Sequence, residues 1–252
     1  MVMKVDLNSD MGEGFGPWRM GDDAALLDVI TSANIACGFH AGDPDVMAET
    51  MRLAAKNGVG IGAHPGFADL KGFGRRRLNI GADELSNMIA YQLGAAEGVA
   101  KSVGAKIRHF KLHGALANMC AEDATLAKTC YSAALRVNPE IILMVLAETA
   151  QQAVVQELGA NWAGEIFADR AYEDDATLVD RSKAGAVLHD ADMAAERILN
   201  MLREDAIIAE SGKRIPAKID TICLHGDTPE AVEMARALRT KLSAAGVTLT
   251  QF

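Results

Sequence analysis

The chain has 252 residues, of which 50% are hydrophobic and 23% charged, and its formal net charge is −9 at pH 7. This composition is typical of a folded globular protein, and the acidic balance excludes the basic surface that nucleic-acid binding requires. No apolar run is long enough for a signal peptide or a membrane span, and the cysteines show no CxxC spacing. We therefore expect a cytoplasmic protein with reduced thiols and no membrane or nucleic-acid partner.

Seven short apolar runs have the character of strands, and most are followed by a helical pattern. They lie at about residues 4–8, 30–36, 59–63, 107–112, 141–145, 165–168 and 219–224. Because strands alternate with helices, the pattern predicts parallel strands joined by helical crossovers.

The clearest predicted helix follows the second strand. Asp43 is a good N-cap, Pro44 suits the first helical position, and Asn57-Gly58 is a typical C-terminal signal. Further helices are predicted over residues 83–103, 121–137, 191–210 and 229–245, where apolar residues recur with the helical period. Residues 212–216 have the composition of a surface hairpin.

Parallel strands joined by helices build either an open sheet or a closed barrel, and the polar residues at the ends of the strands distinguish between these two folds. An open sheet concentrates its ligand residues at one switch point, whereas a barrel collects them from the carboxyl ends of many strands. Here most of the predicted strands end in polar residues, so we predict a parallel (β/α) barrel that forms a single domain over residues 1–252.

The alternation of side chains along each strand identifies an inward face. Counted back from the last polar residue of each strand, this face carries Asp6, Asn8 and Asp10, then His64, then His109, Lys111 and His113, then Glu165 and Asp169, and finally Thr221, Cys223 and His225. A barrel interior is usually filled by branched apolar residues. Because buried charges are costly unless they pair, bind a metal or face a wet cavity, this polar face predicts an active site.

Four histidines, namely His40, His64, His113 and His225, follow different predicted strands with glycine or proline close by. One histidine after a strand is more often structural than catalytic, but four in equivalent positions indicate a functional cluster. His189 has no such company and is interpreted as an ordinary residue.

Two glycine-containing loops have the composition of anion sites. In "GFGRRRL", Arg75 and Arg76 are either a solvated face or a clamp for a carboxylate or phosphate, and both interpretations are open. The loop "GEGFG" only superficially resembles a phosphate-binding loop, because the chain contains no G-x-x-x-x-G-K-[ST] motif. A self-contained P-loop ATPase is therefore excluded.

Long motifs cover nearly the whole chain and together resemble the LamB/YcsF family, which provides the A subunit of prokaryotic ATP-dependent 5-oxoprolinase. These motifs are "DLNSDMGEGFG", "GDDAALLDVITSANIACGFHAGDP", "GVGIGAHPGFADLKGFGRR", "RHFKLHGALAN", "EIFADRAY", "LVDRSKAGAVLHD" and "TICLHGDTP". Ser9, Leu112 and Ala117 depart from residues common in the family, but the ionisable residues are intact.

The resemblance implies a seven-stranded barrel of the glycoside hydrolase/deacetylase type. It also implies the conversion of the small-molecule substrate 5-oxoproline, with ATP and water, to glutamate, ADP and phosphate. ATP would then be a co-substrate of a hetero-complex with two partner subunits, B and C.

For this reaction we predict that Asp10 is the general base, and that Lys111 and His113 protonate the departing ring nitrogen or stabilise the oxyanion. The predicted substrate-binding residues are Asn8, Glu13, Asn34, His40, His64, Arg75, Arg76, Glu165, Asp169, Arg170 and His225. A divalent metal held by Asp10, His40 and His64 is a further hypothesis.

Two alternatives stay open. One is a metal-dependent amidohydrolase or carbohydrate deacetylase, since one aspartate and two histidines suit a divalent metal. The other is a non-catalytic subunit that presents substrate to its partners. The sequence also leaves open a homo-oligomer, and whether ATP binds this chain or its partners.

Overall fold

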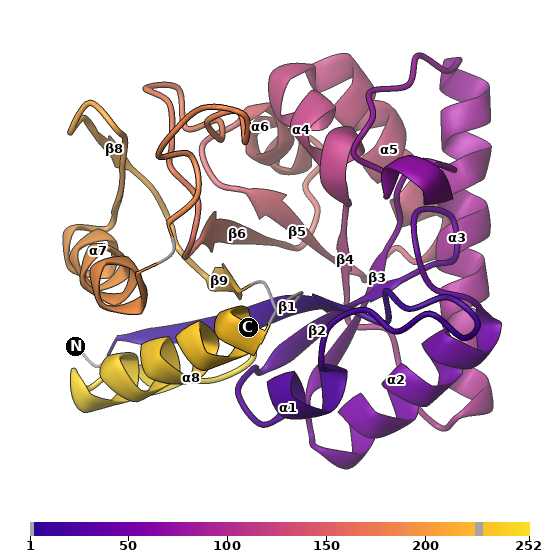
Figure 1. Cartoon of the computed structure of the whole chain (residues 1–252). Helices are drawn as coiled ribbons and strands as arrows, with labels where there is room; N and C mark the ends of the chain where they lie inside the picture. The colour runs from indigo at the N-terminus through magenta and orange to yellow at the C-terminus, as the bar shows by residue number, and fades with distance from the viewer. Residues whose placement is uncertain (1–2, 189, 225–228) are drawn as a thin grey trace.

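The computed structural model describes residues 3–188, 190–224 and 229–252, and within them seven parallel strands form a closed barrel (Figure 1). The strands are β1 (Lys4–Met11), β2 (Ser32–Ala36), β3 (Gly60–His64), β4 (His109–Lys111), β5 (Ile142–Leu146), β6 (Trp162–Phe167) and β9 (Thr221–Leu224). They pair in this order, and β9 pairs back to β1, which confirms the predicted fold. The short β10 (Thr248–Leu249) pairs with the start of β1.

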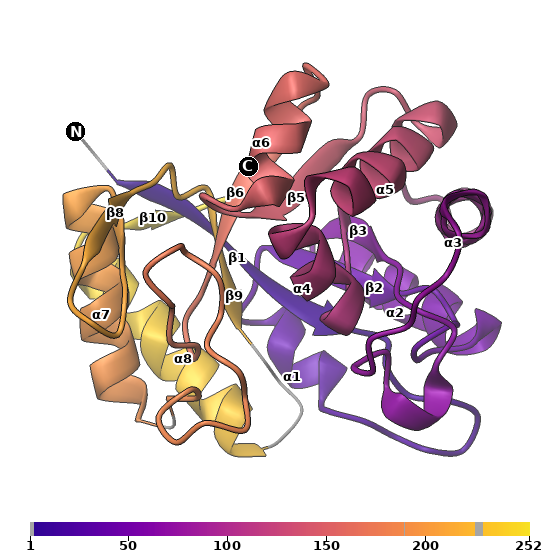
Figure 2. The same cartoon turned by 90° about the horizontal axis from the view of Figure 1, so that it is seen from above.

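Helices surround the barrel, as the view from above shows (Figure 2). They are α1 (Asp23–Leu27), α2 (Pro44–Lys56), α3 (Ala82–Ser102), α4 (Gly114–Glu122), α5 (Ala124–Val137), α6 (Ala150–Glu157), α7 (Ala191–Glu204) and α8 (Pro229–Ala244). The predicted cap of α2 is confirmed, because the Asp43 carboxylate accepts hydrogen bonds from the backbone N–H groups of Asp45 and Val46. No helix in the described part of the chain is long and apolar enough to cross a membrane.

Two predicted helices differ from the structure. The helix predicted over residues 121–137 is interrupted at Asp123, whose extended backbone ends α4 and whose carboxylate caps α5. The helix predicted over residues 191–210 stops at Glu204, because Asp205 adopts a left-handed conformation with φ of 46°. The chain then forms the antiparallel pair β7 (Ala206–Ile208) and β8 (Arg214–Pro216), which confirms the hairpin predicted there.

The apolar core lies between the barrel and its helices. Leu7, Ile35 and Phe110 from the strands are fully buried, as are Met51 of α2 and Leu93 of α3. Burying each large apolar side chain contributes about 1.5–3 kcal/mol. Because this core lies outside the strands, the barrel interior is left to the polar face.

The last residues of the chain lie against the amino-terminal end of the barrel. The Gln251 side chain donates to the Gly58 carbonyl oxygen at 2.7 Å, and Arg108 donates to the Phe252 carbonyl oxygen at 3.2 Å. The ring of Phe252 packs edge-on to His109, with centroids 5.5 Å apart. The polar strand ends face the opposite, carboxyl-terminal end, where barrels of this architecture place their active sites.

Candidate active site

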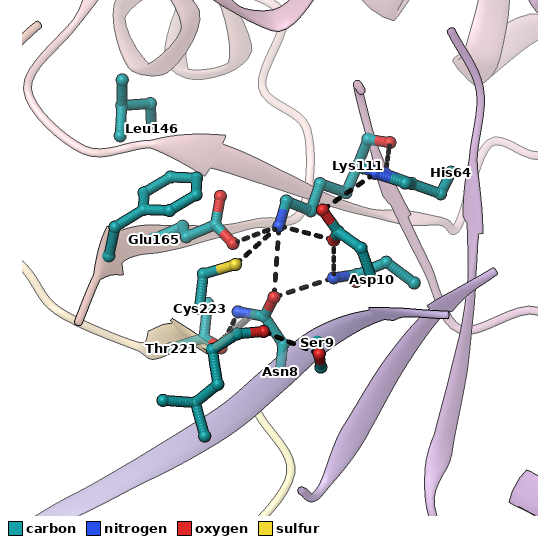
Figure 3. A network of polar contacts seen from close by, with 12 residues as sticks. Asn8, Ser9, Asp10, His64, Lys111, Leu146, Glu165, Thr221 and Cys223 are labelled. Atoms are coloured by element: carbon teal, nitrogen blue, oxygen red, sulfur yellow. Dashed lines mark hydrogen bonds and ion pairs between the residues drawn. The ribbon is translucent and has the colours of Figure 1, made fainter. Parts of the chain in front are cut away.

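A buried lysine lies at the centre of the barrel interior (Figure 3). Lys111 Nζ lies 3.0 Å from Asp10 Oδ1 and 2.8 Å from Glu165 Oε1, and it also donates to Asn8 Oδ1 at 3.3 Å and Cys223 Sγ at 3.2 Å. Burial alone would lower the pKa of Lys111, but the negative charges of Asp10 and Glu165 outweigh burial and hold this pKa well above its usual value. Lys111 therefore stays positively charged.

The two oxygens of the Asp10 carboxylate have different neighbours. Oδ1 accepts hydrogen bonds from Lys111 Nζ and, at 2.9 Å, from Asn34 Nδ2. Oδ2 lies 3.3 Å from His64 Nε2. The side chain is 15% exposed, so a mostly buried carboxylate is fixed through Oδ1 while it contributes to the wall of a cavity.

The polar network continues below Asp10 into the barrel. Asp6 accepts hydrogen bonds from the hydroxyls of Thr31 at 2.6 Å, Ser32 at 2.7 Å and Thr221 at 2.5 Å, while Thr221 accepts from Asn8 Nδ2 at 2.8 Å. Burial raises the pKa of Asp6, and the hydroxyl donors oppose that rise. The structure thus places Asp6, Asn8 and Asp10 of β1 on the polar face that the alternation predicts.

Three of the four predicted histidines form a cluster beside Asp10. The rings of His40 and His113 stack with centroids 3.7 Å apart, and His64 packs edge-on to both. Glu13 Oε1 lies 3.8 Å from His40 Nε2 and 4.0 Å from His113 Nδ1. The fourth, His225, lies outside the described residues, as does His189.

Two backbone carbonyls fix the orientation of this cluster. His64 Nδ1 lies 2.8 Å from the Lys111 carbonyl oxygen, and His113 Nε2 lies 2.8 Å from the Phe73 carbonyl oxygen. Because a carbonyl only accepts hydrogen bonds, these two nitrogens carry the protons. Burial lowers the pKa of His113 to about 3, so its ring is neutral and presents a lone pair at Nδ1, 3.1 Å from His64 Nε2.

His40 differs from its neighbours. It is fully buried, and burial lowers its pKa well below the usual value, so the ring is neutral. Neither of its nitrogens has a hydrogen-bond partner among the described residues. Because buried polar groups are costly to leave unbonded, this histidine indicates a ligand.

A cavity of about 470 Å³ opens at the carboxyl end of the barrel next to this network. Its buried wall includes Lys111 and Glu165, with Asp10 and His64 beside them, and its further wall carries four arginines. These are Arg75, Arg77, Arg170 and Arg181. The cavity therefore joins a compact set of ionisable groups to a cationic rim, which suits a small anionic ligand.

The sequence matches the LamB/YcsF family over residues 5–252. The chain therefore belongs to the LamB/YcsF family. The 5-oxoprolinase A subunit of Ruegeria pomeroyi is 64% identical over 251 residues, covering 100% of this chain and 99% of that protein, and the 5-oxoprolinase A subunit of Rhodopseudomonas palustris (strain CGA009) is 53% identical, covering 99% of each.

Solved structures show the same fold. A lactam utilization protein from Thermus thermophilus has a TM-score of 0.93 at 39% identity, covering 99% of this chain and 100% of that one. A family 4 carbohydrate esterase from Streptomyces lividans has a TM-score of 0.51 at 11% identity over 98% of this chain and 91% of that one, a likeness of fold alone.

Arg76 is among the predicted substrate-binding residues of this LamB/YcsF chain that do not line the cavity. Arg76 forms an ion pair with Asp69, its side chain is 63% exposed, and it does not line the cavity. Asp69 also accepts from the Gly72 N–H and caps a short 3-10 helix there. The substrate-binding role of Arg76 stays a prediction, and the ion pair with Asp69 does not favour it. Arg75 does line the cavity, together with Arg77, which the sequence did not single out.

Other predicted residues support the site from behind. The amide of Asn34 contacts Asn8 and Asp10. Among the residues that the structure describes, the predicted ones that do not line the cavity, besides Arg76, are Asn8, Glu13, Asn34, His40 and Asp169. Arg170 does line it, but its guanidinium also donates to the Val179 carbonyl oxygen at 2.6 Å and thereby holds the loop of residues 171–187.

Proposed function

We propose that this chain is the A subunit of an ATP-dependent 5-oxoprolinase, which opens the lactam ring of 5-oxo-L-proline to give L-glutamate. ATP is hydrolysed to ADP and phosphate in the same cycle, and subunits B and C complete the complex. We place this complex in the cytoplasm. The observation that carries the proposal is the set of Asp10, Lys111 and Glu165 at the cavity, in a chain whose full-length relatives are 5-oxoprolinase A subunits.

The coupling to ATP follows from the chemistry of the substrate. A five-membered lactam is a stabilised amide, and phosphorylation of its oxygen makes the ring carbon open to attack by water. Since the chain contains no P-loop motif, we assign phosphorylation to the partner subunits and ring opening to this chain.

The geometry supports separate roles for the charged residues. Asp10 accepts the proton of the attacking water, because its carboxylate reaches the cavity and is held in position by Lys111 and Asn34. Lys111 acts as a fixed positive charge that stabilises the negative charge of the phosphorylated reaction centre, since its raised pKa makes it a poor proton donor. The low pKa of His113 likewise argues against an imidazolium donor there. We infer that protonated Asp10 returns the proton to the departing ring nitrogen as the carbon–nitrogen bond breaks. The product of this step is γ-glutamyl phosphate, which a second water hydrolyses to glutamate and phosphate.

We also propose that a divalent metal ion binds beside this base. Ligand atoms of Glu13, His40, His64 and His113 all lie within 4.8 Å of one another. The carbonyl oxygens of Lys111 and Phe73 hold the outer nitrogens of His64 and His113, which is how second-shell acceptors orient metal-binding imidazoles. When bound, such an ion polarises a carbonyl or phosphoryl oxygen.

This ligand set differs from the predicted one. Glu13 and His113 join His40 and His64, whereas Asp10 is not part of the group, and its Oδ2 lies 3.3 Å from His64 Nε2. That arrangement leaves Asp10 to act as the base while the imidazoles hold the ion.

The test of function is a reconstituted assay of glutamate and phosphate formation from 5-oxo-L-proline. We expect glutamate only when this chain, subunits B and C, and ATP are all present. Ring opening by this chain without ATP would instead indicate a metal-dependent amidohydrolase. Undiminished turnover by a complex containing the Asp10→Asn variant would indicate a subunit that only presents substrate.

The test of the metal is independent of turnover. Elemental analysis of tag-free protein should find about one divalent ion per chain, and either His40→Ala or His113→Ala should remove it. His109→Gln, which changes a buried histidine outside the group, is the matched control and should retain the ion. Metal-free protein that is fully active in excess chelator would exclude the proposed ion.

A further inference from the structure

One layer of the barrel carries a connected set of side chains on four consecutive strands. In the strand register Asp10 of β1 pairs with Asn34 of β2, Asn34 pairs with Gly62 of β3, and Gly62 pairs with His109 of β4. All four therefore lie at one level of the inward face. Three of them carry polar side chains, and the fourth has none.

The missing side chain at Gly62 makes room for the ring of His109. A Cβ atom at position 62 would lie 2.1 Å from His109 Nε2 and 2.2 Å from its Cδ2, so any other residue there would displace the imidazole. The ring crosses β3 through this gap, and Nε2 lies 2.7 Å from Asn34 Oδ1. His109 is 1% exposed, so water does not compete for this contact.

The direction of each hydrogen bond in this layer is determined. Asn34 Nδ2 donates to Asp10 Oδ1 at 2.9 Å and to Asn8 Oδ1 at 2.8 Å, so Asn34 Oδ1 must face the imidazole and accept. His109 consequently carries its proton on Nε2. Burial, assisted by the nearby charge of Lys111, lowers the pKa of His109 to about 3, so the ring is neutral and has that one proton.

We propose that His109 is a positioning residue for ring opening, acting through Asn34 on the carboxylate of Asp10. The inference rests on the proposed function of Asp10 as the base. Without a donor at position 109, the buried oxygen of the Asn34 amide loses its hydrogen bond, and the amide keeps its orientation through the donations of Nδ2 to Asn8 and Asp10 with less support. Any rotation of this amide would set Asn34 Oδ1 against the carboxylate of Asp10, which would shift the carboxylate away from its contact with Lys111.

A pair of variants separates this role from simple core packing. His109→Leu removes the donor, and in the assembled complex it should lower kcat about tenfold with KM nearly unchanged. His109→Gln places an amide N–H group near the position of Nε2, so it should retain most of the activity. Equal losses in both variants, with equally lowered melting temperatures, would mean that His109 only packs the core.

A double-mutant cycle tests whether the effect passes through Asn34. In an Asn34→Ala background, His109→Leu should cause no further loss of kcat, because the residue it acts on is already gone. Independent, additive losses would overturn the proposed route.

A measurement on the wild-type chain tests the geometry without any turnover. Long-range ¹H–¹⁵N NMR spectra at pH 7 should show His109 as a neutral ring protonated at Nε2, and Asn34→Ala should change the Nε2–H signal. A ring protonated at Nδ1, or a charged ring, would overturn the inference. A wild-type complex that forms no glutamate would instead refute the proposed function, and the two failures are therefore distinct.

Discussion

The lysine-centred charges and the imidazole cluster lie side by side in one barrel, yet their electrostatics are opposite. Around Lys111, a cation contacts two carboxylates within 3.0 Å, and their negative charges hold the pKa of Lys111 well above its usual value despite burial. Around His40, burial keeps the rings of His40 and His113 neutral, and the carboxylate of the group, Glu13, lies 3.8 Å from His40 Nε2.

The difference shows what each region is built for. The first region is complete within the protein, so its charges are ready to act on a substrate without rearrangement. The second gathers imidazole nitrogens and one carboxylate oxygen within 4.8 Å of one another, which is the donor set proposed above for a divalent ion.

The largest expected effect lies in the first region, at its proposed base. Asp10→Asn is nearly isosteric, so it should leave the melting temperature within a few degrees of wild type while lowering turnover of the assembled complex by ~10²–10⁴-fold. Steady-state assays of glutamate formation measure this loss. Wild-type turnover would remove Asp10 from the chemistry.

Removing the positive charge of Lys111 should destabilise the folded chain. Lys111→Met leaves the carboxylates of Asp10 and Glu165 buried without their partner, which should cost about 3–5 kcal/mol of unfolding free energy in urea titrations. The double variant Lys111→Met/Glu165→Gln removes one of the stranded charges and should recover part of that loss. If the double variant is no more stable than the single one, the pairing described here does not govern stability.

Much of this arrangement could be predicted from the sequence, because a barrel repeats one simple rule. Alternation along the strands correctly put Asp6, Asn8 and Asp10 on one face with Lys111 and Glu165. The periodicity that predicts strands and helices depends only on neighbouring residues in the sequence. The seven strands and the helix cap at Asp43 could therefore also be predicted from the sequence.

The conformation of loops and the contacts between distant strands could not be predicted. Arg76 turns to Asp69 because of a local ion pair within its own loop, and periodicity does not describe loops. The reach of His109 across Gly62 depends on the strand register, which places those two residues at one level only in the folded barrel. The participation of Glu13 depends on how the loop after β1 folds back over His40.

The neutrality of the buried imidazoles should make the stability of the chain depend on pH. The pKa values of His40, His109 and His113 are lowered in the folded chain, whereas an unfolded histidine titrates near ~6.5. Below about pH 6.5 the unfolded state binds more protons than the folded state, so the contribution of these rings to stability is present above about pH 6.5 and falls as the pH is lowered. For His109 and His113 this loss continues down to a pH of about 3. In the presence of chelator, each of these histidines should add up to ~1.4 kcal/mol per pH unit to the slope of the unfolding free energy against pH.

His109→Gln isolates one of these contributions, since it keeps a neutral donor that does not titrate. Denaturant titrations between pH 6.5 and 4 measure the unfolding free energy at each pH. Its slope against pH should be smaller in the variant than in wild type, by up to ~1.4 kcal/mol per pH unit. The groups facing this ring, Lys111, His64 and Arg108, are unchanged in the variant. An unchanged slope would mean that His109 is not held neutral by the fold.

The smallest expected effect lies at the rim, where the chain supplies its own control. Arg75 lines the cavity, and Arg76, one residue later, is held by Asp69 outside it. Arg75→Lys keeps the charge but loses the planar two-pronged donor, so coupled glutamate formation should fall about tenfold if this residue binds the substrate carboxylate or a phosphoryl group. Arg76→Lys should leave coupled activity unchanged.

Neither variant should change the melting temperature, and ATP hydrolysis driven by the partner subunits should be less affected than ring opening. If both variants retain full coupled activity while their binding to subunits B and C weakens, the rim is a docking surface for the partners and the anion-binding role of Arg75 is wrong.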